Sequence, residues 1–148
     1  MHIREARDED LPALGELFDA YRQFYALPGD VKKATGYIGA RLVARDSVVL
    51  IAVDERQQVI GFTQLYPTWC SLLAGPVYVL YDLYVAPAAR RGGVGRALLQ
   101  AAAERGRRDG KLRMTLSTAK TNRVGQALYE STGWQRDDEF YVYNLAIP

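Results

Sequence analysis

Apolar positions near the start of the chain recur with helical spacing. Leu14, Leu17, Phe18, Tyr21 and Phe24 lie three or four residues apart. Side chains with this spacing share one face of a helix. The pattern therefore predicts an amphipathic helix that turns this stripe towards a core. Helical patterns are also expected from residue 30 to residue 45, from residue 94 to residue 109, and from residue 121 to residue 131.

Shorter runs of apolar and β-branched residues alternate with these helices and predict strands. The central strand starts at Val79 and is ended by Pro87, because proline lacks the amide hydrogen that a strand ladder uses. Pro67 is expected to end the strand before it for the same reason. The full set of expected strands covers residues 2–6, 47–54, 59–66, 79–86, 112–118, 134–135 and 140–147.

This order of elements predicts an α/β (mixed α+β) fold. One mixed sheet is expected with helices on both faces, and residues 79–118 are expected to form a strand–helix–strand crossover with parallel strands. We find no linker or repeat, so residues 1–148 are expected to form a single domain, a usual length for one core.

The stretch after the central strand has the features of a phosphate site. Arg90, Arg91 and Arg96 surround a turn that contains Gly92, Gly93, Val94 and Gly95. A glycine-rich turn that opens a helix leaves backbone amides without partners, and the helix dipole adds partial positive charge there. The sequence therefore predicts phosphate binding, although neither the Rossmann fingerprint nor the P-loop pattern is present.

Two segments resemble the GNAT family of N-acetyltransferases. Arg90-x-x-Gly93-x-Gly95 resembles the family's acetyl-CoA-binding motif, [Q/R]-x-x-G-x-[G/A]. Residues 122–134 (NRVGQALYESTGW) are similar to its N-x-x-A-x-x-L-Y-E-x-x-G-[FW] region, with Gly125 in place of the usual alanine. The resemblance spans nearly the whole chain.

The resemblance implies a GNAT-like fold, a mostly antiparallel twisted sheet with one splayed parallel strand pair. It also implies acetyl-CoA as co-substrate. Pantetheine would pair with the free edge of the central strand, and the pyrophosphate would lie on the turn amides. The residues expected to bind the cofactor are Leu83, Tyr84, Val85, Arg90, Arg91, Gly92, Gly93, Val94, Gly95, Arg96 and Asn122.

Transfer of an acyl group to an amine makes two proton demands. Tyr129 occupies the family's tyrosine position, and its phenol can give a proton to the departing thiolate. Asp82 is the only charged residue of the central strand, and alternation places it opposite Tyr81 and Leu83. Three roles stay open for Asp82: general base, anchor for a cationic substrate, or structural hydrogen-bond acceptor.

The resemblance implies an acceptor pocket lined by the first two helices and the loop before the central strand. Tyr25, Trp69 and Tyr81 are the candidate substrate-binding residues, because aromatic rings hold ammonium groups by cation–π contact. Polyamine acetyltransferases of this fold often carry a glutamate where this chain has Tyr81, which disfavours a polyamine acceptor.

Composition excludes some functions. The net charge is only +2, so no nucleic-acid partner is expected; the basic residues 105–113 are interpreted as a solvated helix end. The single cysteine rules out an internal disulfide and suits the cytoplasm. No apolar run is long enough for a membrane span, and no metal site is expected.

We therefore expect an acetyl-CoA-dependent N-acetyltransferase that acts on a small-molecule or protein amine, with a homodimer as one possibility. The alternative is a non-catalytic acyl-CoA-binding regulator or interaction module on the same fold.

Overall fold

The computed structural model describes all residues from 1 to 148. The chain divides into two compact units, Met1–Ser117 and Thr118–Pro148. The first unit holds most of the regular structure. In chain order it contains β1 (His2–Glu5), α1 (Leu11–Phe24), α2 (Val31–Ala44), β2 (Val48–Val53), β3 (Val59–Cys70), β4 (Gly75–Val85), α3 (Val94–Arg108) and β5 (Met114–Thr115).

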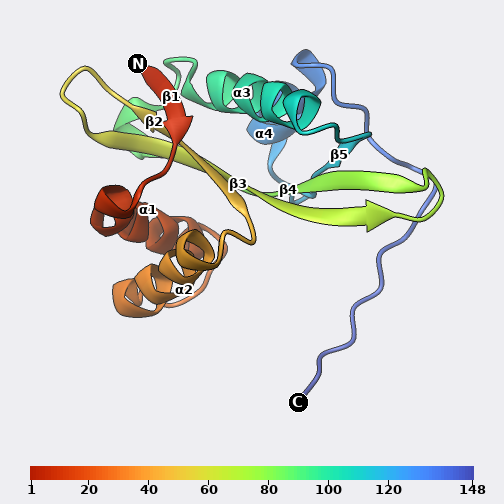
Figure 1. Ribbon diagram of the computed structural model, residues 1–148, viewed down its shortest axis with the longest axis horizontal. Helices are drawn as coiled ribbons and strands as arrows, with labels where there is room; N and C mark the ends of the chain where they lie inside the picture. The colour runs from red at the N-terminus through yellow and green to blue at the C-terminus, as the bar shows by residue number, and fades with distance from the viewer. The chain divides into compact units, whose positions relative to one another are not determined.

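The five strands form one sheet in the order β1-β2-β3-β4-β5. All neighbouring pairs are antiparallel except β4 and β5, which are parallel. In Figure 1, α1 and α2 cover one side of the sheet and α3 covers the other. The predicted mixed, mostly antiparallel sheet with helices on both faces is confirmed.

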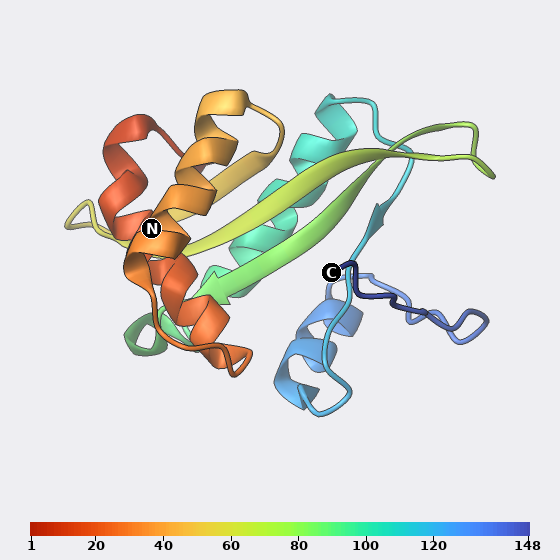
Figure 2. The ribbon, with the colours of Figure 1, turned by 90° about the horizontal axis from the view of Figure 1, so that it is seen from below.

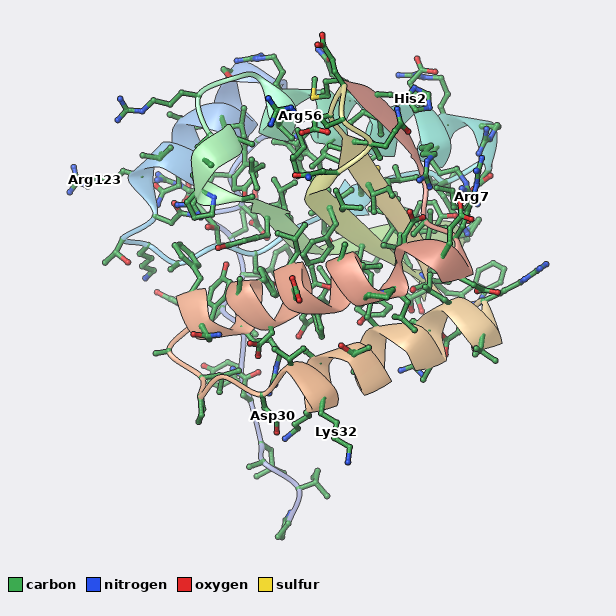
Figure 3. All side chains as sticks on the ribbon, turned by 90° about the vertical axis from the view of Figure 1, so that its left-hand side faces the viewer. His2, Arg7, Asp30, Lys32, Arg56 and Arg123 are labelled. Atoms are coloured by element: carbon green, nitrogen blue, oxygen red, sulfur yellow. The ribbon has the colours of Figure 1, made fainter.

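The first two helices form where the sequence predicts them. α1 begins with Pro12 in its first turn, where the missing amide hydrogen costs nothing, and it buries Leu14 and Phe18. Asp30 caps the N-terminus of α2: its Oδ1 accepts a hydrogen bond of 3.1 Å from the Lys33 amide. Figure 3 shows Asp30 at this end of α2, with α1 and α2 lying side by side.

The core between these helices and the sheet is apolar. Strand β2 is buried along its whole length, because both of its faces are covered. Phe62 on β3 and Tyr84 on β4 lie opposite each other and pack with the helices. The buried cluster consists of Leu14, Phe18, Ala34, Ile38, Val49, Ile51, Val53, Phe62 and Tyr84.

Strands β3 and β4 form a hairpin arm that is longer than the sequence predicts (Figure 2). Pro67 does not end β3, so that expectation is wrong. Pro67 lies opposite Tyr78, whose amide donates to the Arg113 carbonyl on the other side of β4. The pair is therefore one that exchanges no hydrogen bonds, and β2 stops short of it, so proline removes no ladder bond.

A β-bulge interrupts the arm at Tyr81. Gln64 pairs with Asp82, whereas Leu65 pairs with Leu80, so Tyr81 has no partner on β3. The extra residue shifts the alternation of β4 by one position. As a result, Asp82 lies on the same face as Gln64, Phe62 and the helices α1 and α2, and Leu80 lies on the opposite face.

The end of the chain differs most from expectation. Strand β5 contains only Met114 and Thr115, instead of seven residues. The second unit contains one regular element, α4 (Arg123–Ser131), and the strands expected at residues 134–135 and 140–147 are absent. Residues 140–147 have strand-like composition, but a strand forms only where a partner edge supplies hydrogen bonds, and these side chains are exposed.

Candidate active site

The predicted phosphate turn opens α3 with free backbone amides. Gly93 is the N-cap residue and has no side chain to satisfy them. The first intrahelical bond runs from the Ala97 amide to the Gly93 carbonyl at 3.0 Å, so the amides of Val94 and Gly95 have no partner within the helix. Gly93 has a φ of 79°, a left-handed conformation that glycine adopts without strain.

The arginines of the turn differ in how they are held. Arg90 Nε donates to the Val85 carbonyl at 3.0 Å, and its guanidinium lies 5.3 Å from the centre of the Tyr84 ring. Arg90 is therefore fixed at the end of β4. Arg91 and Arg96 are exposed, and Arg91 adopts a left-handed φ of 65°. Positive charge and free amides thus occur in the same turn, which suits a phosphate group.

The outer edge of β4 beside this turn is unpaired. β5 pairs with β4 only at Tyr78 and Val79. The Ala86 amide bonds to Ile60 on β3, and antiparallel bonds alternate, so the amides of Leu83 and Val85 point away from β3. This edge and the α3 turn offer hydrogen-bond donors that an extended amide chain ending in phosphates would satisfy.

The side chain of Asp82 points to the face of β4 that α1 and α2 cover. Only 5% of it is exposed. Its Oδ2 accepts a 2.7 Å hydrogen bond from Gln64 Nε2, and its backbone carbonyl accepts a 2.8 Å bond from Thr63 Oγ1. Burial raises the pKa of Asp82, and the hydrogen bond from Gln64 lowers it by less.

A group of tyrosines surrounds this carboxylate. The Tyr21 hydroxyl donates to the Tyr81 carbonyl at 3.2 Å, and burial together with the nearby Asp82 charge raises the Tyr21 pKa. The rings of Tyr66 and Tyr81 meet edge to face at 5.4 Å. We call the following residues the tyrosine cluster: Tyr21 of α1, Tyr25 at the C-terminal cap of α1, Tyr37 of α2, Tyr66 of β3 and Tyr81 of β4.

Two of the three predicted acceptor residues belong to this cluster. Tyr25 packs edge to face on Tyr21 at 5.1 Å, and Tyr81 lies next to Asp82 with 64% of its surface exposed. Trp69 does not: it lies near the tip of the hairpin arm, opposite Pro76, and is 76% exposed. The structure therefore brings Tyr25 and Tyr81 together and leaves Trp69 apart from them.

The predicted residues of the second unit occupy α4. Asn122 is its N-cap: its Oδ1 accepts from the Gly125 amide at 3.1 Å, and its Nδ2 donates to Thr118 at 3.0 Å. Asn122 thus has a structural role in addition to the cofactor contact expected from the sequence. Tyr129 is half-buried, and its ring meets Trp134 edge to face at 6.4 Å.

Three residues next to this site, Gln64, Ser47 and Tyr37, were not predicted from the sequence. Gln64 lies in an apolar strand, and an isolated amide in such a run is a usable signal, because buried polar groups are rarely left without partners. Tyr37 gave no such signal, since its 2.6 Å hydroxyl contact with Tyr66 depends on how α2 packs on the sheet.

Two observations concern other kinds of site. No three His, Cys, Asp or Glu side chains gather in a way that would hold a metal ion. None of the helices combines the length and apolar character that a bilayer-spanning helix requires.

The arrangement suits acyl transfer. Free amides and positive charge are suited to a phosphate-bearing carrier, and a carboxylate with a raised pKa is a better proton acceptor at neutral pH than an ordinary aspartate. The tyrosine cluster offers rings and hydroxyls to an ammonium group.

Comparison with known proteins identifies the family. The profile of the acetyltransferase (GNAT) family matches residues 7–134. A protein of Bacillus subtilis (strain 168), named uncharacterized N-acetyltransferase YhfO, is 42% identical over 148 residues, covering 100% of this chain and 99% of the relative.

Solved structures agree. The crystal structure of a "probable acetyltransferase" superposes with a TM-score of 0.92 at 40% identity, covering 100% of this chain and 99% of that one. A predicted acetyltransferase from Clostridium acetobutylicum, solved with acetyl-CoA, shares the fold with a TM-score of 0.77 at 19% identity, covering 97% and 95% of the two chains. The chain belongs to the acetyltransferase (GNAT) family and is an enzyme of that family.

Proposed function

We propose that this enzyme transfers the acetyl group of acetyl-CoA to a primary amine by direct attack in a ternary complex. The observation that carries the proposal is that β4 offers two kinds of chemistry next to each other, one at its outer edge and one on its helix-covered face. Its outer edge and the adjoining α3 turn present unpaired amides, and its helix-covered face presents the buried Asp82 carboxylate. We further propose that residues 1–148 work as one acetyltransferase domain, since the family match extends across both compact units.

Acetyl-CoA is the expected co-substrate because the residues present fit its chemistry. We assign the pantetheine amides to Leu83, Tyr84, Val85 and Asn122. The α3 amides and guanidinium groups suit its phosphates, so we assign those to residues 90–96. A structural neighbour solved with acetyl-CoA supports this assignment at the level of the fold.

Asp82 is proposed to receive the proton of the attacking amine. An aliphatic amine has a pKa near ~10.4 and is mostly protonated at neutral pH, so it needs a proton acceptor before it can attack. The amine nitrogen then attacks the thioester carbonyl: a C–N bond forms and the C–S bond breaks. An anchoring role, in which the same carboxylate binds the ammonium group of the acceptor, draws on the same burial and the same tyrosine rings.

Tyr129 is proposed to give a proton to the departing thiolate. A phenol with a pKa near ~10 is protonated at neutral pH and can donate to sulfur. The nitrogen loses its second proton as the amide forms, and this proton replaces the one that Tyr129 gave, while Asp82 releases the first proton to solvent. The products are an N-acetyl amine and the free thiol of CoA, so atoms and charge balance. Support for Tyr129 comes from its place in the family motif and from its half-buried ring beside Trp134.

A panel of amines scored by release of free CoA thiol tests this function. The proposal expects thiol release that depends on both acetyl-CoA and an amine, with an N-acetylated product in the mass spectrum. The panel should include amino acids, small amines, aminoglycosides and lysine-containing peptides. Binding of CoA without turnover on any amine would instead support an acyl-CoA-binding regulator.

A further inference from the structure

Gln64 is a fully buried side-chain amide in the middle of β3, with the apolar Phe62 and Leu65 buried close to it in the strand. None of its surface is exposed. Moving an amide out of water without hydrogen-bond partners is costly, and an apolar residue of similar size would pack there at no such cost. The position of Gln64 therefore calls for an explanation through its partners.

Both ends of the Gln64 amide are bonded. Its Oε1 accepts a 2.8 Å hydrogen bond from Ser47 Oγ, and its Nε2 donates at 2.7 Å to Asp82 Oδ2. The donors thus run in one direction, from Ser47 through Gln64 to the carboxylate. In such a chain each bond polarises the next, and the chain ends on a group that accepts, which a charged carboxylate does best.

The bulge is what makes this contact. Because Tyr81 is the extra residue, Asp82 lies directly opposite Gln64 on the helix-covered face. Without the extra residue, Asp82 would point to the opposite face. The register of the two strands sets the face to which Asp82 points, and the hydrogen bond from Gln64 fixes the carboxylate there.

The groups that face Asp82 include no cation that would balance its charge. Asp82 forms no ion pair. The hydroxyls around it come from the tyrosine cluster, with Tyr21 on α1, Tyr25 at the end of α1, Tyr66 on β3 and Tyr81 on β4. From α2, Tyr37 bonds to Tyr66, and Arg41 lies over the Tyr37 ring at 5.0 Å and pairs with Asp46. Gln64 is therefore the side-chain amide that supports a charged Asp82.

We propose that Gln64, oriented by Ser47, is a positioning residue for Asp82: it fixes the carboxylate towards the tyrosine cluster and supplies the hydrogen bond that lets it carry a charge there. The catalytic meaning of this inference rests on the proposed function. The hydrogen bond from Gln64 to the carboxylate does not depend on the proposed function, and its effect can be measured without turnover.

The main test compares three single variants of the full-length protein. Gln64→Met keeps the length of the side chain and removes both hydrogen bonds. Ser47→Ala keeps Gln64 but removes the group that orients it; Ser47 lines a hollow of about 720 Å³ and is only half-buried, so its loss is less of a risk to folding. Thr63→Val is the matched control, since it breaks an equally buried bond to the backbone carbonyl of Asp82 rather than to the carboxylate.

The readout is the pKa of the Asp82 carboxyl, from carbon NMR over pH, assigned with Asp82→Asn. Loss of one hydrogen bond to a charged group should raise this pKa by about one to two units in Gln64→Met. Ser47→Ala should raise it by less, and Thr63→Val should leave it near the parent value. An unchanged pKa in folded Gln64→Met would overturn the proposal. If that variant does not fold, a Ser47→Ala value equal to that of Thr63→Val overturns it.

Kinetics separate this inference from the proposed function. With a good amine acceptor, the low-pH limb of kcat/KM should move with the carboxyl pKa in Gln64→Met and Ser47→Ala, and not in Thr63→Val. A carboxyl pKa that moves while the limb stays in place supports the positioning by Gln64 and refutes the base role of Asp82. No movement of either quantity refutes the positioning.

Discussion

At the scale of single residues, Asp82 is the most unusual group of the molecule. It is a carboxylate with 5% of its surface exposed and no cation paired with it. Burial favours the neutral form and raises its pKa above the ordinary value, against the hydrogen bond from Gln64, which favours the charged form. Such an arrangement lowers stability at neutral pH, and sites of this kind are often functional.

The pH dependence of stability follows from the sign of this shift. A carboxyl whose pKa is raised in the folded state binds its proton more tightly there, so its contribution to stability is full below the unfolded pKa and is lost as pH rises through the folded pKa. We expect Asp82→Asn to melt at a higher temperature than the parent at neutral pH. The difference should shrink as pH falls through the raised folded pKa of Asp82, and it should be smallest below about 4.

Asp10 gives the matched control with the opposite sign. Arg4 binds Asp10 through two nitrogens at 2.7 and 2.9 Å, and this hydrogen bonding lowers the Asp10 pKa. Its contribution is present above the unfolded pKa and is lost as pH falls, so Asp10→Asn should melt below the parent at neutral pH. A fall in melting temperature for Asp82→Asn, together with parental kcat and KM, would assign Asp82 a purely structural role.

The proposed role of Tyr129 as general acid depends on its hydroxyl group alone. Tyr129→Phe keeps the ring that packs against Trp134 and removes only the hydroxyl. Loss of a general acid should lower kcat by about 10²–10⁴-fold, with little change in the affinity for CoA. Tyr143→Phe is the control, because Tyr143 is 91% exposed and carries no proposed role. Equal kcat values in both variants, with chemistry rate-limiting, would exclude the acid.

At the scale of elements, α3 carries the test of the phosphate site. Its two ends both have a glycine with positive φ, Gly93 at 79° and Gly110 at 70°, and a side chain at either position would meet no atom within 4 Å. Gly93→Ala and Gly110→Ala should therefore lose similar stability, about 1–2 kcal/mol each, from backbone strain alone.

Only the first of these glycines lies where we place the pyrophosphate. Gly93→Ala should weaken CoA binding by at least about tenfold, equivalent to ~1.4 kcal/mol, because a methyl group and a shifted backbone keep phosphate from the amides. Gly110→Ala should bind CoA like the parent. Calorimetry with CoA measures both, and equal affinities would place the phosphates elsewhere.

At the scale of the whole molecule, burial and regular secondary structure are concentrated in the first unit of the chain. All six residues of β2 are buried, and the main core cluster lies entirely within the first unit. Residues 140–147 form no strand, and their large apolar side chains are between 72% and 91% exposed. Exposed apolar residues in such a run are unusual for a folded chain.

Hydrogen exchange should report this contrast directly. Amides of β2 and of the inner half of β3 are expected to exchange slowest, with protection close to the free energy of global unfolding. Amides of residues 140–147 should exchange fastest, because no strand partner protects them. Strong protection of residues 140–147 would show that they pair as the sequence pattern predicts, and measuring it over protein concentration would tell pairing within one chain from pairing between copies.

The sequence by itself determined those features whose cause is local. Helical spacing predicted α1 and the burial of Leu14 and Phe18, although Phe24, the last residue of the predicted stripe, is 56% exposed because it lies in the last turn of the helix. An aspartate at the right place capped α2, and glycine with arginine marked the turn before α3. The family motifs are also local, and they were sufficient to identify the family. Each of these depends on residues only a few positions apart.

The tertiary structure alone decided where the candidate chemistry lies. Alternation along β4 does not reveal the extra residue at Tyr81, because a bulge is a property of two paired strands. That bulge sets the face of Asp82, and the pairing across it brings Gln64 into contact with the carboxylate. The same dependence on a partner explains why Pro67 continues a strand, whereas residues 140–147, with strand-like composition, form none. Strand pairing joins residues far apart in the sequence, so local patterns cannot fix it.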